Sequence, residues 1–195
     1  MTWAISLKAV NRTADPIRAL WDQVSLYEGA PSIAALNYPP HITLAIYKDI
    51  DPDLLKVALR RASMEVPALR LTFTRLCFFD VDPLVLWAEP CPSPALAQAN
   101  AAVHACIDPA MCHPHYQPGA WIPHCTLGTK IKKEHRAEAI AFTARPLEPF
   151  DVLFDVADCV SFPPVATLEE HVLAGDHGDP RPGEENHAKE KNCHP

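Results

Sequence analysis

Pro40-His41-Ile42-Thr43-Leu44 and Pro123-His124-Cys125-Thr126-Leu127 share one pattern, Pro-His-x-Thr-Leu, and lie 83 residues apart. Each segment follows a predicted unit of strand and helix, and each precedes another predicted helix. The surroundings therefore repeat together with the motif. Repetition on this scale predicts two structurally related lobes within one chain.

Strand geometry gives this motif its meaning. Successive side chains of a β-strand point to opposite faces, so the histidine and threonine of each copy share one face. The residues between and after them point the other way, into a core. If a pseudo-twofold relates the lobes, the polar faces oppose each other across a cleft that contains His41, Thr43, His124 and Thr126.

This set of groups suits the opening of a cyclic phosphodiester. The reaction needs a base that deprotonates water and an acid that protonates the departing ribose oxygen. Histidine, with an ordinary pKa near 6.5, does either at neutral pH. Threonine hydroxyls supply hydrogen bonds to the phosphoryl oxygens without a metal.

The paired motifs resemble the two-histidine phosphoesterase superfamily, and specifically its bacterial 2′-5′ RNA ligase family. The second copy is especially similar in its setting, Gln117-Pro118-Gly119-Ala120-Trp121-Ile122-Pro123-His124-Cys125-Thr126-Leu127. The resemblance covers roughly residues 1–175, which we expect to form one domain of two pseudo-symmetric lobes. It implies a bilobal, duplicated α+β fold in which each lobe is an antiparallel sheet flanked by helices, with the active cleft between the lobes.

The resemblance also implies 2′,3′-cyclic phosphodiesterase or 2′-5′ RNA ligase chemistry without a metal or nucleotide cofactor. It assigns the catalytic set to His41, Thr43, His124 and Thr126, with His124 as base on water and His41 as acid. The residues alone leave that order open, and they leave hydrolysis and ligation open as well. A non-catalytic module that binds nucleotides or RNA ends is the alternative, although such a module does not need both imidazoles.

Helix and strand signals alternate along the chain. A capping residue followed by proline predicts helix starts at Asp15-Pro16, Asp51-Pro52 and Ser93-Pro94. A weaker helical pattern covers 132–143. Strand patterns cover 2–10, 69–78, 83–88, 152–162 and 166–174. Residues 176–195 contain no aliphatic residue larger than alanine and no aromatic residue, which predicts a disordered tail.

Composition limits the partners and the compartment. A net charge of −7 argues against a protein that coats long nucleic acid, so a mononucleotide or a short RNA end is expected. No apolar run approaches the roughly 20 residues of a membrane span, and the first residues lack a secretory pattern. The seven cysteines form no CxxC pair and are expected to be reduced thiols. We therefore expect a cytoplasmic protein, and we expect it to act as a monomer.

Further residues are candidates for substrate binding. Tyr47 is expected on the same strand face as His41 and Thr43, and Tyr116 and Trp121 lie just before the second motif. Each is placed to stack on a base, although core packing is the more frequent role of such residues. His115 lies in a proline-flanked loop from which it can reach the cleft. Lys130 begins a basic cluster that either meets phosphates or forms the exposed first turn of a helix.

A zinc site is the competing interpretation of the histidine-rich segment. Cys112, His113 and His115 precede His124 and Cys125. Their spacing matches no common structural zinc pattern, and the last two residues face opposite sides of one strand. We expect no bound metal.

Overall fold

The computed structural model describes residues 1–175, so the predicted tail at 176–195 lies outside the described residues. Within residues 1–175, eight strands form one antiparallel sheet in the order β6-β3-β4-β5-β2-β1-β7-β8. The strands are β1 (Thr2–Lys8), β2 (His41–Lys48), β3 (Leu69–Phe79), β4 (Val85–Pro90), β5 (Cys125–Gly128), β6 (Phe150–Phe154), β7 (Val156–Phe162) and β8 (Ala166–Val172).

Four α-helices cover this sheet in the described part of the chain: α1 (Asp15–Ser25), α2 (Pro52–Glu65), α3 (Pro94–His104) and α4 (Arg136–Thr143). Short 3-10 turns occur at Arg12–Ala14, Ala34–Leu36, Pro109–Met111, Pro114–Tyr116 and Lys133–His135. No helix within residues 1–175 has the length and apolar character that crossing a membrane requires.

The sheet consists of two four-stranded halves, β2-β1-β7-β8 and β6-β3-β4-β5. They join at the motif strands, where Ile42 of β2 pairs with Cys125 of β5. The predicted α+β architecture with antiparallel sheets and flanking helices is confirmed. The structure adds that the two half-sheets are hydrogen-bonded at their edges into one continuous sheet.

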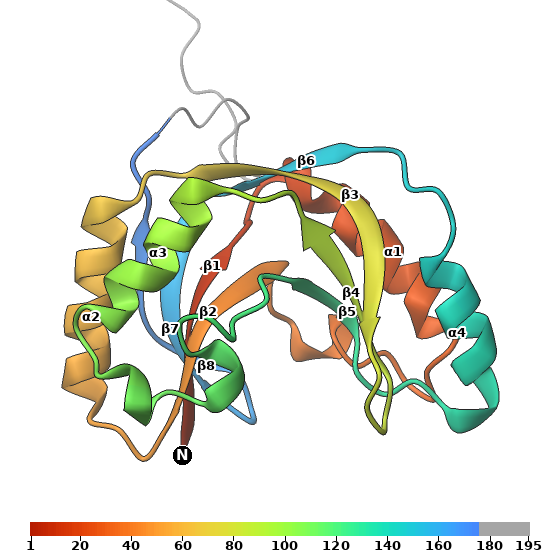
Figure 1. Ribbon diagram of the computed structural model, residues 1–195, viewed down its shortest axis with the longest axis horizontal. Coiled ribbons are helices and arrows are strands. Elements are labelled where there is room, and N and C mark those ends of the chain that lie inside the picture. The colour runs from red at the N-terminus through yellow and green to blue at the C-terminus, as the bar shows by residue number, and fades with distance from the viewer. Residues whose placement is uncertain (176–195) are drawn as a thin grey trace, which may run out of the picture.

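Helices α1 and α3 each pack against the half-sheet to which they do not belong in sequence. Helix α1 follows β1 of the first half but packs against β5 of the second, whereas α3 follows β4 and packs against β2. Helix α2 packs against strands β7 and β8, and helix α4 packs against β3. Figure 1 shows α2 and α3 together on the left and α1 and α4 on the right, with the strands arching between them. Each half therefore depends on a helix contributed by the other.

Three helices begin where the sequence predicted, and two of them have the predicted caps. The side chain of Asp51 accepts a hydrogen bond from a backbone N–H at the start of α2, and Ser93 does the same for α3. The predicted cap at Asp15 is wrong, because Asp15 lies inside α1. Asn11 instead caps the preceding 3-10 turn by accepting from the backbone N–H of Thr13, and that turn runs directly into the helix.

The single alternating segment predicted at 152–162 is two strands. Strand β6 pairs with β3 in one half, and β7 pairs with β1 in the other. Only Asp155 separates them, and its carboxylate accepts a hydrogen bond from the backbone N–H of Val10 at 3.1 Å. Residue alternation continues through the crossover, so the pattern does not mark where the chain changes halves.

Both motif strands contain a β-bulge at the same place. In β2 the paired residues step from Thr43 to Ala45, and in β5 they step from Thr126 to Gly128. The leucine of each motif is the extra residue, and Leu44 and Leu127 are both buried in the core. Beyond a bulge the side-chain alternation reverses. Residues five positions after each motif histidine therefore point toward the cleft instead of the core.

Candidate active site

The pairing of Ile42 with Cys125 places the four motif side chains on one face of the sheet. Both paired residues are buried, at 0% and 1% exposure. Their neighbours along each strand point to the opposite face. The structure thus brings together the side chains that the sequence predicted to share a cleft, namely His41, Thr43, His124 and Thr126.

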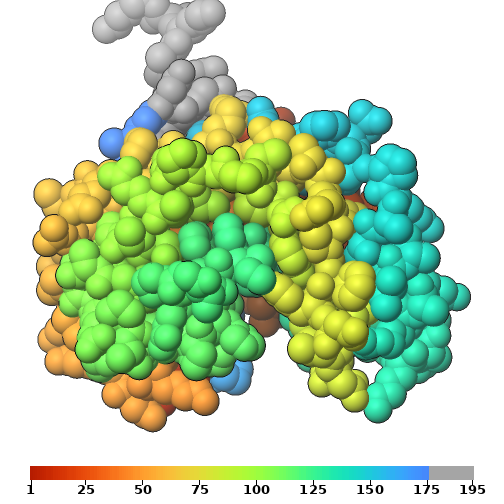
Figure 2. Space-filling model, viewed as in Figure 1, coloured from red at the N-terminus to blue at the C-terminus, as the bar shows by residue number. Residues whose placement is uncertain are grey.

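Two adjoining pockets occupy this face. The larger, of about 520 Å³, contains His124 and Thr126, and the smaller, of about 260 Å³, contains His41 and Thr43. Figure 2 shows the surface hollowed between the β3–β4 hairpin and the segment that leads to β5. The pockets share three lining residues: Tyr116, Thr126 and Thr129. The two histidines therefore lie on either side of a common junction.

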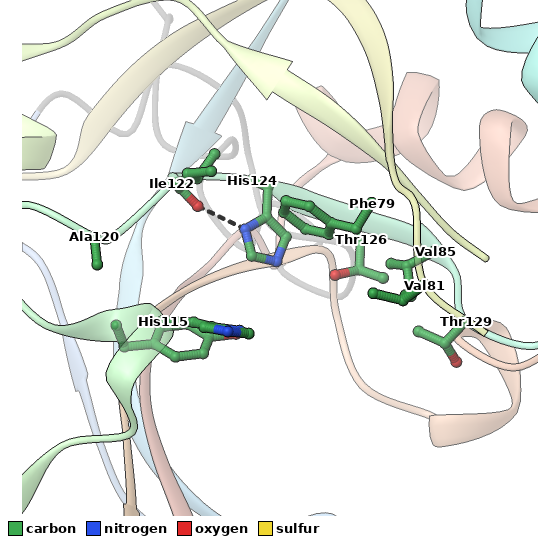
Figure 3. Close-up of a pocket in the computed structure, with 10 residues that line it drawn as sticks. Phe79, Val81, Val85, His115, Ala120, Ile122, His124, Thr126 and Thr129 are labelled. Atoms are coloured by element: carbon green, nitrogen blue, oxygen red, sulfur yellow. Dashed lines mark hydrogen bonds between the residues drawn. The ribbon is translucent and has the colours of Figure 1, made fainter. Parts of the chain in front are cut away.

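Each imidazole is held in one tautomer by its own backbone. His41 Nδ1 lies 2.9 Å from the carbonyl oxygen of Pro39, and His124 Nδ1 lies 2.7 Å from that of Ile122 (Figure 3). A carbonyl oxygen only accepts hydrogen bonds, so Nδ1 carries the proton in both rings. The lone pair of each neutral ring is then on Nε2, as a general base requires.

The surroundings lower the pKa of both histidines below the ordinary value of 6.5. For His41, burial is the main cause, the bond to Pro39 opposes it, and the Lys8 ammonium adds to it. For His124, burial again dominates, the bond to Ile122 opposes it, and a charge on His41 lowers the pKa further. The two rings therefore sense each other's protonation, which disfavours the doubly protonated state.

The two histidines differ in what surrounds them. The rings of Tyr38 and His41 pack edge to face with their centroids 4.8 Å apart, and the Tyr38 hydroxyl donates a hydrogen bond to Asp158 at 2.6 Å. Lys8 forms an ion pair with the same carboxylate at 2.9 Å. His124 instead lies against aromatic rings, with centroids 5.2 Å away for Phe79, 5.7 Å for Trp87 and 6.5 Å for Tyr116. A polar network thus borders one imidazole and an apolar wall borders the other.

Two tryptophans hold the motif strands by the same contact. Trp21 Nε1 donates to the carbonyl oxygen of Thr126 at 3.0 Å, and Trp121 Nε1 donates to that of Thr43 at 3.0 Å. Trp121 was a candidate for base stacking, but it lines neither pocket. Its indole N–H instead fixes the backbone of a motif threonine.

We expect Trp121→Phe and Trp21→Phe each to lower the free energy of unfolding by about 1–3 kcal/mol, because a partly buried carbonyl loses its donor. Trp87→Phe is the matched control, since Trp87 Nε1 is buried without a hydrogen-bond partner among the described residues. The same ring truncation there removes no bond. Urea denaturation of the three variants measures the difference, and equal losses in all three would contradict this role.

The structure separates the other predicted binding residues. His115 and Tyr116 line the larger pocket, and Tyr116 lines the smaller one as well. The prediction that Tyr47 shares a face with His41 is wrong: Tyr47 is 0% exposed in the core, because the bulge in β2 reverses the alternation before it. Lys130 is exposed and lines neither pocket.

Several cleft residues were not predicted from the sequence. The apolar wall of the larger pocket comes from the β3–β4 hairpin, whose contribution depends on the fold: Phe79, Val81 and Val85. Thr129 reaches the junction only because of the bulge in β5. Ser6 and Tyr38 line the smaller pocket, and the Ser6 hydroxyl lies 3.5 Å from that of Thr43.

Residues 1–175 contain no group of three or more histidine, cysteine, aspartate or glutamate side chains that is arranged to hold a metal ion. The structure therefore gives the zinc interpretation no support within these residues. Cys112 is 3% exposed and Cys125 is 1% exposed, and burial raises the pKa of both thiols. The six cysteines within the described residues are free thiols: Cys77, Cys91, Cys106, Cys112, Cys125 and Cys159.

The family model of the 2′-5′ RNA ligase superfamily matches residues 8–162. This chain belongs to that superfamily. The matched segment contains both Pro-His-x-Thr-Leu motifs, so the resemblance noted from them is confirmed. A search of curated proteins gives no match to this member of the 2′-5′ RNA ligase superfamily.

Solved structures share the fold. The E. coli protein LigT, complexed with 3′-AMP, superposes with a TM-score of 0.62 at 16% identity, covering 89% of this chain and 98% of LigT. The protein TT0787 of Thermus thermophilus gives 0.60 at 14% identity, covering 91% of this chain and 100% of that one. A structure described as a phosphoesterase gives 0.57 at 15% identity, with 89% and 99% covered. At such identities the likeness establishes the fold alone.

Proposed function

We propose that this protein opens 2′,3′-cyclic phosphates of nucleotides or short RNA ends by two-histidine acid–base catalysis, without a metal, and leaves the 2′-phosphate. The observation that carries the proposal is the pair of tautomer-fixed imidazoles on one sheet face, at the junction of two pockets. Membership of a phosphoesterase and ligase superfamily supports it.

In the proposed reaction the phosphate lies at the junction, between the two rings. Following the family resemblance, we assign His124 to water activation through its Nε2 lone pair. His41, protonated at Nε2, gives its proton to the departing ribose oxygen. The hydroxyls of Thr43 and Thr126 donate to phosphoryl oxygens, on which negative charge builds up in the transition state. With a 5′-hydroxyl in place of water as the nucleophile, the same groups in the same protonation states would join it to the 2′,3′-cyclic phosphate, which is 2′-5′ RNA ligation.

A small substrate fits these pockets better than a long nucleic acid. The larger pocket is lined mainly by apolar and aromatic groups, and Phe79 and Tyr116 offer faces for stacking on a base. Among the residues that the structure describes, no lysine or arginine lines either pocket. The LigT structures hold 3′-AMP in one case and ATP in another, which are ligands of this size. Both histidines come from one chain, so a single copy is sufficient to form the site, and we propose that the protein acts as a monomer. We also propose that it acts in the cytoplasm.

The deciding experiment is turnover of a panel of 2′,3′-cyclic mononucleotides and short RNAs ending in a cyclic phosphate, with and without EDTA. We expect conversion to the 2′-phosphate, unchanged by EDTA, with product identity read by chromatography against 2′- and 3′-phosphate standards. Binding without any conversion would instead support a nucleotide-binding module. Loss of turnover on chelation, restored by zinc, would contradict the metal-independent mechanism.

The lowered histidine pKa values predict where activity is greatest. The profile of kcat/KM against pH reports the free enzyme, so we expect a bell with its maximum below pH 6.5. Activity falls at higher pH because the acid loses its proton, and at lower pH because the base gains one. A bound phosphate anion raises both pKa values, so the kcat profile lies at higher pH. A kcat/KM maximum at pH 7 or above would contradict this prediction.

A further inference from the structure

The pseudo-symmetry of the motifs is broken at one cleft position. Ile46 lies five residues after His41, and Thr129 lies five residues after His124. The matched bulges turn both residues toward the cleft, where both line the smaller pocket. The first half therefore presents a hydrocarbon side chain where the second presents a hydroxyl.

Thr129 lies at the junction of the two pockets, where the proposed function places the phosphate. It is one of three residues that line both pockets, together with Tyr116 and Thr126. Among the described residues, the pocket walls contain no lysine or arginine. An anionic phosphoryl group held here depends on hydroxyl and imidazole donors, because no fixed cation lines the walls. Each additional hydroxyl at the junction therefore adds a hydrogen-bond donor for the phosphoryl group.

A buried carboxylate holds the segment that contains Thr129. Glu28 is 8% exposed, and its Oε1 accepts from the backbone N–H of Thr129 at 3.0 Å and from that of Lys130 at 2.9 Å. Ser32 completes the arrangement: its hydroxyl donates to Glu28 Oε1 at 2.6 Å, its N–H donates to Oε2 at 2.8 Å, and its Oγ accepts from Thr129 N–H at 2.9 Å. Glu28 thus accepts four hydrogen bonds.

The preceding glycine shows how closely the segment packs on this carboxylate. A Cβ on Gly128 would lie 2.5 Å from Val24 Cγ1 and 3.0 Å from Glu28 Oε1. The backbone can approach the carboxylate this closely only without a side chain. The end of β5 is therefore fixed from behind, with Thr129 facing forward into the cleft.

We propose that Thr129 is a third hydroxyl donor to the phosphoryl group and that Glu28 is its positioning residue. The proposal rests on the proposed function for the placement of the phosphate, and phosphate binding can be measured without turnover. Glu28 does not touch the substrate. It acts by fixing the backbone of Thr129, and so the direction of that hydroxyl.

The first test compares Thr129→Val with Thr129→Ser. Valine keeps the shape and deletes the hydroxyl, whereas serine keeps the hydroxyl. We expect kcat/KM for a 2′,3′-cyclic nucleotide to fall about tenfold in Thr129→Val, in line with one hydrogen bond to a charged group, and to stay within about threefold of wild type in Thr129→Ser. Thr143→Val is the matched control, because its hydroxyl bonds the Ile140 carbonyl at the end of α4. Wild-type kinetics in Thr129→Val would overturn the proposal.

Inorganic phosphate provides a readout that does not require turnover. Its binding, followed by titrating the histidine ring protons in NMR spectra, should weaken about tenfold in Thr129→Val and remain near wild type in Thr129→Ser. If the wild-type protein converts no cyclic nucleotide, the proposed function fails and this titration alone decides the role of Thr129. Equal phosphate affinity in wild type and Thr129→Val would overturn that role.

The second test asks whether Glu28 acts through Thr129. Glu28→Gln keeps the shape but puts an amide donor where one carboxylate oxygen accepts. We expect kcat/KM to fall several-fold in the wild-type background and hardly at all in the Thr129→Val background. A purely structural role would give the same loss in both backgrounds, which would overturn the positioning role. If Glu28→Gln does not fold, Ser32→Ala removes one acceptor of the Thr129 N–H, and the same comparison of backgrounds applies.

Discussion

Replacing either His41 or His124 by alanine is expected to lower kcat/KM for a 2′,3′-cyclic nucleotide about 10²–10⁴-fold, the usual contribution of one positioned proton carrier. Each imidazole is fixed by a carbonyl oxygen two residues earlier, so each presents Nε2 to the junction. Steady-state hydrolysis measures the loss, and circular dichroism confirms that the variants fold. Undiminished activity in either variant would remove the two-histidine mechanism.

The double variant tests whether the rings work as a unit. Because one ring supplies a proton while the other accepts one, removal of either disables the same step. We therefore expect the double substitution to cost much less than the product of the single losses. His171→Ala is a suitable control, since His171 lies on β8 beside Glu169 and lines neither pocket. It should leave kcat/KM within about threefold of wild type.

An activated substrate distinguishes acid from base. A nitrophenyl phosphodiester releases a stable phenolate that needs no protonation, so the acid becomes dispensable while the base does not. With His41 as acid, His41→Ala should lose far less activity on this substrate than on a cyclic nucleotide, and His124→Ala should lose as much as before. The opposite result would exchange the two roles. In that case the histidine beside the polar network, His41, would be the base, and the histidine beside the aromatic wall, His124, would be the acid.

The alternation of the motifs was sufficient to predict the central face of the site. His41 and Thr43 fall on one side of β2 because the strand is regular there, and their apolar neighbours are buried as expected. The caps at Asp51 and Ser93 were predictable because a side chain and a backbone N–H within three residues form them. These features depend on local sequence, so a pattern can reveal them.

The features that were missed depend on contacts between distant segments. A bulge is a change in pairing register between two strands, and the sequence around Leu44 contains no signal of the bulge in β2. Tyr47 was therefore assigned to the wrong face, and Thr129 was passed over. The indole of Trp121 bonds a carbonyl 78 residues away, so base stacking and backbone support were indistinguishable in the sequence. Local periodicity cannot contain such information.

Thr43→Val and Thr126→Val are each expected to lower kcat about 10²-fold, less than a histidine loss, by comparison with removal of one oxyanion-hole donor. Valine preserves the branched shape and the strand preference, so the change is confined to one hydroxyl. The Ser6 hydroxyl donates to Thr43 Oγ1 at 3.5 Å, which leaves the proton of Thr43 free for a phosphoryl oxygen.

The division of the loss between kcat and KM identifies what each hydroxyl does. A donor that is aimed at charge developing in the transition state lowers kcat and kcat/KM together, whereas one that binds the ground state raises KM. We expect the first result for Thr43 and Thr126. They directly follow Ile42 and Cys125, the pair that joins the two half-sheets, and they lie on the sheet face that carries both imidazoles. Thr43→Ser and Thr126→Ser keep the hydroxyl and should recover most of the activity. If the valine variants raised KM alone, these threonines would bind the substrate without stabilising its transition state.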